Sequence, residues 1–89
     1  MDMLESLSLK QLRYFSAVAQ YGSFRQAASR LNITQPTLSS QVAGMEKAMG
    51  IQLFERTRKG INITPLGREL LHSANRVLEE AQGFATQAS

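Results

Sequence analysis

The fold is decided by residues 23–49, SFRQAASRLNITQPTLSSQVAGMEKAM. They hold two helical patterns, at 24–31 and 35–49, separated by a turn at 32–34. Ala27 and Ala28 give the first helix a small apolar face, which lets a second helix approach closely. The second pattern buries one narrow face, because its apolar residues recur at helical spacing: Leu38, Val42, Met45 and Met49. The stretch predicts a helix-turn-helix.

The exposed face of the second helix is short-chained, neutral or basic, and rich in hydrogen-bonding groups near its start. Its members are Gln35, Pro36, Thr37, Ser39, Ser40, Ala43 and Lys47. Such a face suits base edges and phosphates in a DNA major groove. Thr34 is the predicted N-cap and Pro36 lies in the first turn, where the free amides and the helix dipole favour a phosphate. Both residues are also ordinary helix-start chemistry, which is compatible with a role in DNA binding.

A further helix is predicted at 9–21, before the helix-turn-helix. Ser8 and Gln11 form the pattern of a capping box, and Gly22 supplies the stop. The same box recurs at Ser23 and Gln26, so the next helix starts after a very short connection and at a large angle. We expect residues 1–7 to be frayed, with Leu4 and Leu7 as the residues that could dock on the domain.

Residues 51–63 have the pattern of a short hairpin, with strands at 51–54 and 61–63 and a tip at 55–60. Because an isolated hairpin is only marginally stable, Leu53, Ile61 and Ile63 are expected to face the helices. The tip then carries three basic residues: Arg56, Arg58 and Lys59. This arrangement predicts a wing that reaches a DNA backbone or minor groove; the alternative is a solvated surface turn.

The last segment reads as one long helix, with Thr64 as its cap and Pro65 at its first position. Its apolar residues are spaced four, three, four, three and four apart from Leu70 to Ala88, which is the spacing of a coiled-coil seam. So small a domain cannot bury the whole seam, so we expect part of it to pair with a second chain. The candidate dimerisation residues are Leu70, Ala74, Val77, Leu78, Ala81 and Phe84. The alternative is a long helix that lies on its own domain.

Composition narrows the possible functions. Eighty-nine residues make one domain, with net charge +3 and pI about 9.8. Six of the ten basic residues lie between positions 25 and 59, opposed there only by Glu46 and Glu55. There is no cysteine and one histidine, His72, so we expect no catalytic residue, no metal site and no cofactor. With no membrane-length apolar run and an acidic N-terminus, the expected location is the cytoplasm.

An ordered set of short motifs runs from about residue 8 to the end of the chain. It comprises LRYF at 12–15, GSF at 22–24, AA at 27–28, Leu31, TQPTLS at 34–39, QV at 41–42, ME at 45–46, Gly50, LFER at 53–56, TP at 64–65 and Gly67. This set resembles the N-terminal DNA-binding domain of LysR-type transcriptional regulators.

The resemblance implies a mainly α fold: a winged helix-turn-helix of three helices and a two-stranded wing at 8–64, then a linker helix at 65–89 for dimerisation. Helix 35–49 would be the recognition helix, and two linker helices would pair antiparallel. Ser23 would contact a backbone phosphate. Family members are usually tetramers that bind an interrupted palindrome in promoter DNA. The DNA-binding residues implied are Ser23, Thr34, Gln35, Pro36, Thr37, Ser39, Ser40, Arg56, Arg58 and Lys59.

The sequence departs from the family pattern in two respects. Ser40 stands where many members carry an arginine, which leaves base preference open there. The sequence ends at Ser89, where a member would continue into an effector-binding domain of about 200 residues. We interpret the chain as a fragment without the small-molecule sensor, rather than as a short natural protein.

One alternative belongs to another functional class: a helical protein-interaction module that uses residues 65–89 as its binding surface. Such a scaffold would tolerate acidic residues on the exposed face of helix 35–49, which has only Glu46. An enzyme is not expected, because Ser39 and Ser40 have no neighbouring base in the sequence to activate them.

Overall fold

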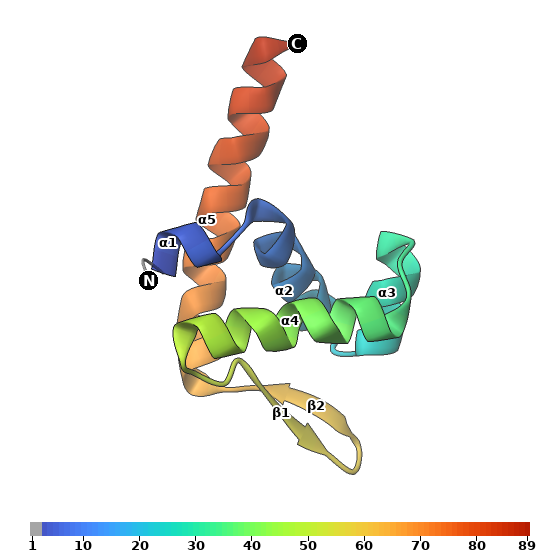
Figure 1. Cartoon of the computed structure of the whole chain (residues 1–89). Helices are drawn as coiled ribbons and strands as arrows, with labels where there is room; N and C mark the ends of the chain where they lie inside the picture. The colour runs from blue at the N-terminus through green and yellow to red at the C-terminus, as the bar shows by residue number, and fades with distance from the viewer. Residues whose placement is uncertain (1–2) are drawn as a thin grey trace.

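The computed structural model describes residues 3–89 and shows a small helical domain with a hairpin at one end and a long helix at the other (Figure 1). The elements in chain order are α1 (Met3–Ser6), α2 (Leu9–Tyr21), α3 (Phe24–Leu31), α4 (Gln35–Met49), β1 (Phe54–Thr57), β2 (Gly60–Ile63) and α5 (Pro65–Ala88). This is the predicted mainly α winged helix-turn-helix followed by a long C-terminal helix.

The N-terminal segment differs from the prediction of a frayed end. Residues 3–6 form the short helix α1, which lies against α4, while residues 1 and 2 fall outside the described part of the chain. Leu7 packs against the hydrophobic core, and Leu4 is 79% exposed. The physical reason for the difference is tertiary: α1 is too short to be stable alone, so it depends on its contact with α4.

The three helices of the central domain have the predicted boundaries, because each is fixed by local capping. Ser8 Oγ accepts from the Gln11 amide and the Gln11 side chain accepts from the Ser8 amide, both at 3.1 Å, so the predicted box is complete. At Ser23 only the bond from the Gln26 amide is present, also at 3.1 Å. Asn32 ends α3 in the left-handed conformation with φ 57°, which asparagine tolerates better than most residues.

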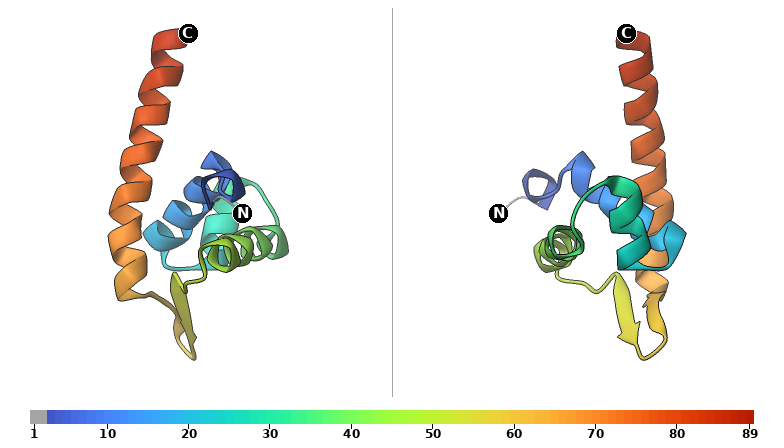
Figure 2. Two further views of the ribbon diagram at one scale, coloured as in Figure 1. Left: turned by 60° about the vertical axis from the view of Figure 1, so that its left-hand side comes forward. Right: turned by 90° about the vertical axis from the view of Figure 1, so that its right-hand side faces the viewer.

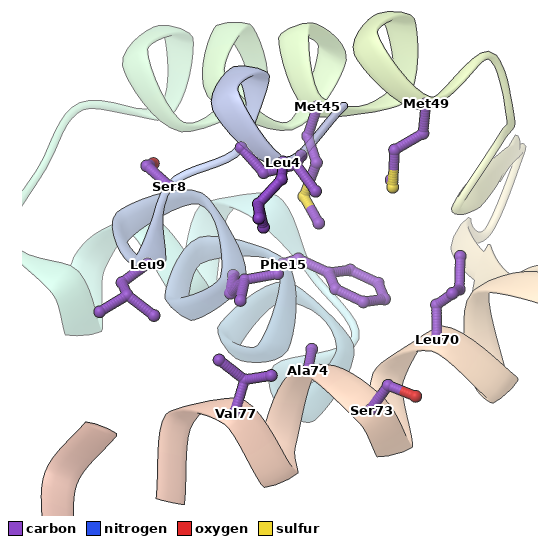
Figure 3. A pocket seen from close by; sticks show the side chains of 12 residues that line it. Leu4, Ser8, Leu9, Phe15, Met45, Met49, Leu70, Ser73, Ala74 and Val77 are labelled. Atoms are coloured by element: carbon purple, nitrogen blue, oxygen red, sulfur yellow. The ribbon is translucent and has the colours of Figure 1, made fainter. Parts of the chain in front are cut away.

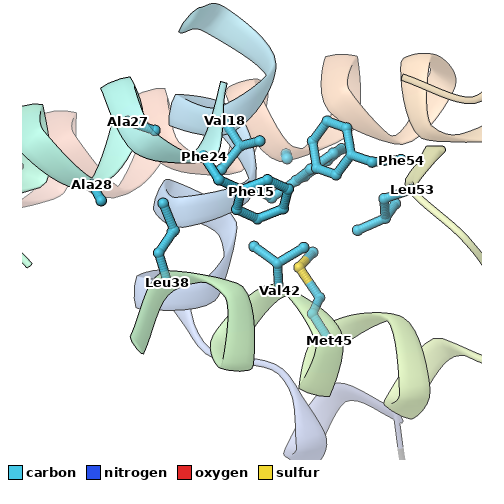
Figure 4. Close-up of a cluster of buried hydrophobic side chains, with 11 residues drawn as sticks. Phe15, Val18, Phe24, Ala27, Ala28, Leu38, Val42, Met45, Leu53 and Phe54 are labelled. Atoms are coloured by element: carbon cyan, nitrogen blue, oxygen red, sulfur yellow. The ribbon is translucent and has the colours of Figure 1, made fainter. Parts of the chain in front are cut away.

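The core fills the space between α2, α3, α4, the first half of α5 and the start of the hairpin (Figure 4). The small side chains of Ala27 and Ala28 are buried and let α3 lie close to α4. Burying one large apolar side chain stabilises a fold by about 1.5–3 kcal/mol. The largest fully buried side chains are Phe15, Leu38, Met45, Leu53, Val18 and Val42.

The hairpin is an antiparallel pair whose register is Phe54 with Ile63, Glu55 with Asn62, Arg56 with Ile61 and Thr57 with Gly60. The predicted strand boundaries were therefore wrong: β1 begins at Phe54 instead of residue 51, and β2 begins one residue earlier than predicted. The two strands meet at a tight turn made by residues 58 and 59. Arg56 consequently lies in β1 and not in the tip. Gly60 has φ 133°, a conformation that favours glycine, and this permits the short turn. Of the three residues predicted to face the helices, Leu53 is buried, and Ile61 and Ile63 are partly buried.

Thr64 joins the hairpin to α5. Its hydroxyl donates to the carbonyl of Gln52 at 2.8 Å and accepts from the Gly67 amide at 2.9 Å. Its own amide donates to the carbonyl of Leu53 at 2.9 Å. One side chain thus caps α5 and ties it to the segment before β1, which fixes the direction of the hairpin relative to the helices.

The helix α5 has 24 residues, a length of about 36 Å at 1.5 Å per residue. Its first half packs on α2, and its second half extends beyond the domain, ending on the side opposite the hairpin (Figure 2). Ala74 is only 4% exposed and Leu70 packs against the core. These two residues of the predicted seam are therefore used within the chain, and Val77 and Phe84 are 45% and 74% exposed.

Candidate nucleic-acid interface

The start of α4 presents the exposed polar face that the sequence predicts. Gln35, Pro36, Thr37 and Ser40 are exposed, and Ser39 is partly buried. The opposite face holds the buried Leu38, Val42 and Met45. Because the buried face is anchored in the core, the exposed face is held rigidly.

Thr34 is committed to shaping this helix start. Its hydroxyl oxygen accepts from the Thr37 amide at 3.3 Å, and its proton is donated to the Thr37 hydroxyl oxygen at 2.8 Å. The Thr37 hydroxyl keeps its own proton for an outside acceptor. The amide of Gln35 has no intrahelical acceptor, and Pro36 has no amide to leave unsatisfied.

A basic hollow of about 370 Å³ lies between the starts of α3 and α4 and the hairpin. Its lining includes Arg25, which was not among the predicted DNA-binding residues. It also includes five residues that were: Ser23, Gln35, Arg56, Arg58 and Lys59. The other five predicted residues are not part of this lining: residue 34 caps α4, and residues 36, 37, 39 and 40 lie along that helix. The predicted residues thus form two adjoining groups, one on the helix face and one in the hollow.

The charge in the hollow is uncompensated. Neither Arg56, Arg58 nor Lys59 forms an ion pair within 4.0 Å among the described residues. The amides of Phe24 and Arg25, at the start of α3, have no intrahelical acceptor. Free amides, a helix dipole and several cations together favour an anion.

The tip of the hairpin is ordered by Thr57. Its hydroxyl donates to the carbonyl of Gly60 and accepts from the amide of Lys59, both at 3.2 Å. These bonds fix the backbone from which two long cationic side chains, Arg58 and Lys59, project into solvent. Arg56 behaves differently, because its guanidinium carbon lies 4.7 Å from the centre of the Phe24 ring.

Glu46 joins α4 to the hairpin, a role that the sequence analysis missed. Its Oε2 accepts from the amides of Leu53 and Phe54, at 2.7 and 3.3 Å. From the sequence, Glu46 was expected to oppose the basic residues and to lie on the exposed face of α4, whereas it is partly buried. A carboxylate near a helix end can accept hydrogen bonds from backbone amides of the loop that follows. The partners of Glu46 are seven and eight residues away, and no local sequence pattern identifies them.

A second, apolar hollow of about 370 Å³ lies between α1, α2, α4 and α5 (Figure 3). Its walls include Leu4 and Leu9 on one side and Val77 on the other, all of which are partly open to solvent. It contains no basic or acidic side chain and is therefore not part of the charged interface.

Neither a metal-binding cluster nor a membrane-spanning helix is found in residues 3–89. In this range no three His, Cys, Asp or Glu side chains are grouped so as to hold a metal ion. No helix here has the length and apolar character that crossing a bilayer requires. His72 is exposed on α5 and lines a shallow hollow with Pro65 and Arg68.

Fold and site together define a winged helix-turn-helix domain with a basic interface. The family model for bacterial regulatory helix-turn-helix proteins of the lysR family matches residues 9–68. The chain belongs to this family and is a DNA-binding domain of the LysR type, as the resemblance indicated.

Similar proteins are transcriptional regulators. The chain is 43% identical over 81 residues to the HTH-type transcriptional regulator CfxR of Cupriavidus necator, covering 91% of this chain and 26% of that protein. It is 43% identical over 82 residues to a probable hydrogen peroxide-inducible genes activator of Mycobacterium xenopi, covering 92% and 43%. The chain thus spans about a quarter of the length of CfxR.

Solved structures with the same fold include two protein–DNA complexes. The complex of BenM_DBD with catB site 1 DNA has a TM-score of 0.89 and 36% identity, with 92% of each chain covered. The complex of CbnR_DBD with DNA has a TM-score of 0.86 and 36% identity, with 92% of this chain and 94% of that chain covered.

Proposed function

We propose that this chain binds double-stranded promoter DNA in a sequence-specific manner, as the DNA-binding part of a bacterial transcription regulator. The observation that carries the proposal is that two surfaces lie side by side. One is the polar face of α4, and the other is the basic hollow, whose cations form no ion pair among the described residues. The protein–DNA complexes of BenM_DBD and CbnR_DBD support it.

In this proposal α4 enters the major groove. Gln35 pairs with adenine edges, the Thr37 methyl group meets a thymine methyl, and Ser39 exchanges hydrogen bonds with several bases. Ser40 provides only a short hydroxyl, so base readout is modest and DNA shape contributes to specificity. The α4 residues assigned to the interface are Thr34, Gln35, Pro36, Thr37, Ser39 and Ser40, with Thr34 acting through the shape of the helix start.

The hollow supplies affinity through phosphates. Ser23, at the start of α3, lies beside a backbone phosphate, and Arg56, Arg58 and Lys59 neutralise the backbone or enter the minor groove. This assignment is supported by the absence of acidic partners for these cations among residues 3–89. Phosphate contacts set the register of the protein on DNA, and the face of α4 then selects the sequence.

Two copies act together through the second half of α5. The residues that contact the second chain are Val77, Ala81 and Phe84, with Leu78 beside them. Leu70 and Ala74 support this seam from inside the domain. A two-fold dimer requires an interrupted palindrome. In the full-length regulator we propose a tetramer that acts in the cytoplasm and responds to a small-molecule effector through a further domain, with no catalytic activity and no cofactor in the present chain.

The experiment that tests this function is selection of binding sites from random duplex DNA at two salt concentrations. We expect a two-fold symmetric motif, because a dimer reads two half-sites. The Gln35→Ala chain is the matched control, and it should lose part of the motif while keeping non-specific affinity. Recovery of unenriched DNA, with binding that vanishes as salt rises, would contradict sequence-specific binding.

A further inference from the structure

Arg56 is the one cation of the hollow that rests on an aromatic ring. Its guanidinium carbon lies 4.7 Å from the centre of the Phe24 ring. That ring is held by the core, because Phe24 is only 6% exposed and meets Phe54 edge-on with the ring centres 5.9 Å apart. Phe54 in turn meets Phe15 at 5.6 Å (Figure 4). The surface under the guanidinium is therefore fixed through three packed rings.

The hairpin brings Arg56 to this ring through its register. Side chains alternate along a strand, so Arg56 points to the same side of β1 as Phe54, two residues earlier. The strand is fixed to α4 at this point, since Glu46 Oε2 accepts from the amide of Phe54. Both partners of the stacked pair are thus anchored, Phe24 in the core and Arg56 on a tethered strand.

The contact with the ring is a cation–π contact and uses no hydrogen-bond donor, so the donors at the edge of the guanidinium remain available. A guanidinium carries five N–H donors in one plane, in a fork that matches two phosphate oxygens. Arg56 lines the hollow with Ser23 and Arg25, at the start of α3, and no carboxylate within 4.0 Å in residues 3–89 occupies that edge.

We propose that Phe24 is a positioning residue for DNA binding: its ring holds the guanidinium of Arg56 in place to receive a backbone phosphate at the start of α3. An arginine side chain without such a contact loses rotamer freedom when it binds a phosphate, which weakens binding. An arginine already held against a ring has lost part of that freedom before binding. The phosphate comes from duplex DNA, so the proposal rests on the function proposed above. The proposal distinguishes Arg56 from Arg58 and Lys59, for which no ring contact is found within residues 3–89.

The test is a double-mutant cycle of Phe24→Leu and Arg56→Ala, measured with a fluorescein-labelled duplex of fixed arbitrary sequence at several salt concentrations. In the chain with Arg56, Phe24→Leu should weaken binding about two- to fivefold, the range of an exposed cation–π contact. In the Arg56→Ala chain the same change should have less than a twofold effect. Arg56→Ala should also flatten the slope of log K against log salt by about 0.9.

The outcomes distinguish this proposal from the function on which it rests. Failure of the unsubstituted chain to bind the duplex would contradict DNA binding itself. Equal losses from Phe24→Leu in both backgrounds would show that Phe24 only supports the fold, and an unaltered affinity in Arg56→Ala would remove the arginine from the interface. Either result overturns the positioning role and leaves DNA binding intact.

Two further measurements keep the test valid if Phe24→Leu fails to fold, which circular dichroism would reveal. Phe24→Met keeps unbranched apolar bulk without a ring and can replace it in the cycle. In the unsubstituted chain, proton NMR should show the side-chain methylene protons of Arg56 shifted upfield by the ring. Unshifted resonances would overturn the proposal.

Discussion

At the scale of single residues, Gly67 is required by a close approach of backbone to backbone. A β-carbon at this position would lie 2.5 Å from the carbonyl oxygen of Leu53 and 2.9 Å from Thr64 Oγ1. Both atoms belong to the junction that directs the hairpin, so neither can move without breaking a hydrogen bond. We expect Gly67→Ala to lower the free energy of unfolding by about 1–3 kcal/mol through overpacking, measured by urea denaturation.

The matched control lies in the same helix. A β-carbon at Gly83 would have nothing within 4 Å, and alanine favours a helix over glycine by about 1 kcal/mol. Gly83→Ala should therefore stabilise the chain, opposite in sign to Gly67→Ala. If the two substitutions had the same effect, the close approach at residue 67 would not govern stability.

At the scale of elements, the hairpin supplies charge that is independent of base sequence. We expect the double substitution Arg58→Ala, Lys59→Ala to weaken binding to specific and arbitrary duplexes alike. The slope of log K against log salt should flatten by about 0.9 for each lost phosphate contact. The measurement is fluorescence anisotropy across a salt series. Lys10→Ala with Arg13→Ala removes the same charge from the exposed side of α2 and is the control; equal effects of both pairs would argue for general attraction without a specific role of the wing.

Apart from α1, where a frayed end was predicted, the helices were predictable from sequence because their signals are local. The caps at Ser8, Ser23, Thr34 and Thr64, together with helical apolar spacing, gave the boundaries of α2, α3 and α4 that the structure has. The exposed polar face of α4 was predictable too, because the residues on the buried face of a helix determine which residues face solvent. These parts of the interface needed no information about tertiary contacts.

The hairpin boundaries and the stacked arginine were not predictable in the same way. Apolar alternation indicated strands at 51–54, but pairing of Thr57 with Gly60 across a tight turn moved β1 toward the tip. The contact of Arg56 with Phe24 joins residues that are distant in sequence. The bonds of Glu46 to the amides of Leu53 and Phe54 cross seven and eight residues, which no local pattern identifies. The seam of α5 shows a related limit: its spacing is regular, yet Ala74 is buried within its own domain.

At the scale of the whole molecule, the second half of α5 carries apolar side chains away from the domain, and a partner chain would cover them. Phe84 is 74% exposed, so replacing it should scarcely affect folding. We expect Phe84→Asp to convert a dimer into monomers in sedimentation velocity, because a charge would then lie within the seam. Affinity for DNA with two half-sites should fall at least about tenfold, equivalent to about 1.4 kcal/mol, while affinity for one half-site stays unchanged.

The control for this prediction is Thr86→Asp, which adds the same charge nearby. Each helical residue turns about 100°, so Thr86 lies nearly opposite the seam formed by Val77, Ala81 and Phe84. Thr86→Asp should remain dimeric and bind the two-site duplex nearly as the unsubstituted chain does. If Phe84→Asp stayed dimeric, the second copy would have to bind elsewhere, and the apolar hollow beside Leu4 and Leu9 would be the next surface to substitute. If both aspartate variants became monomeric, added negative charge rather than loss of the seam would explain the result.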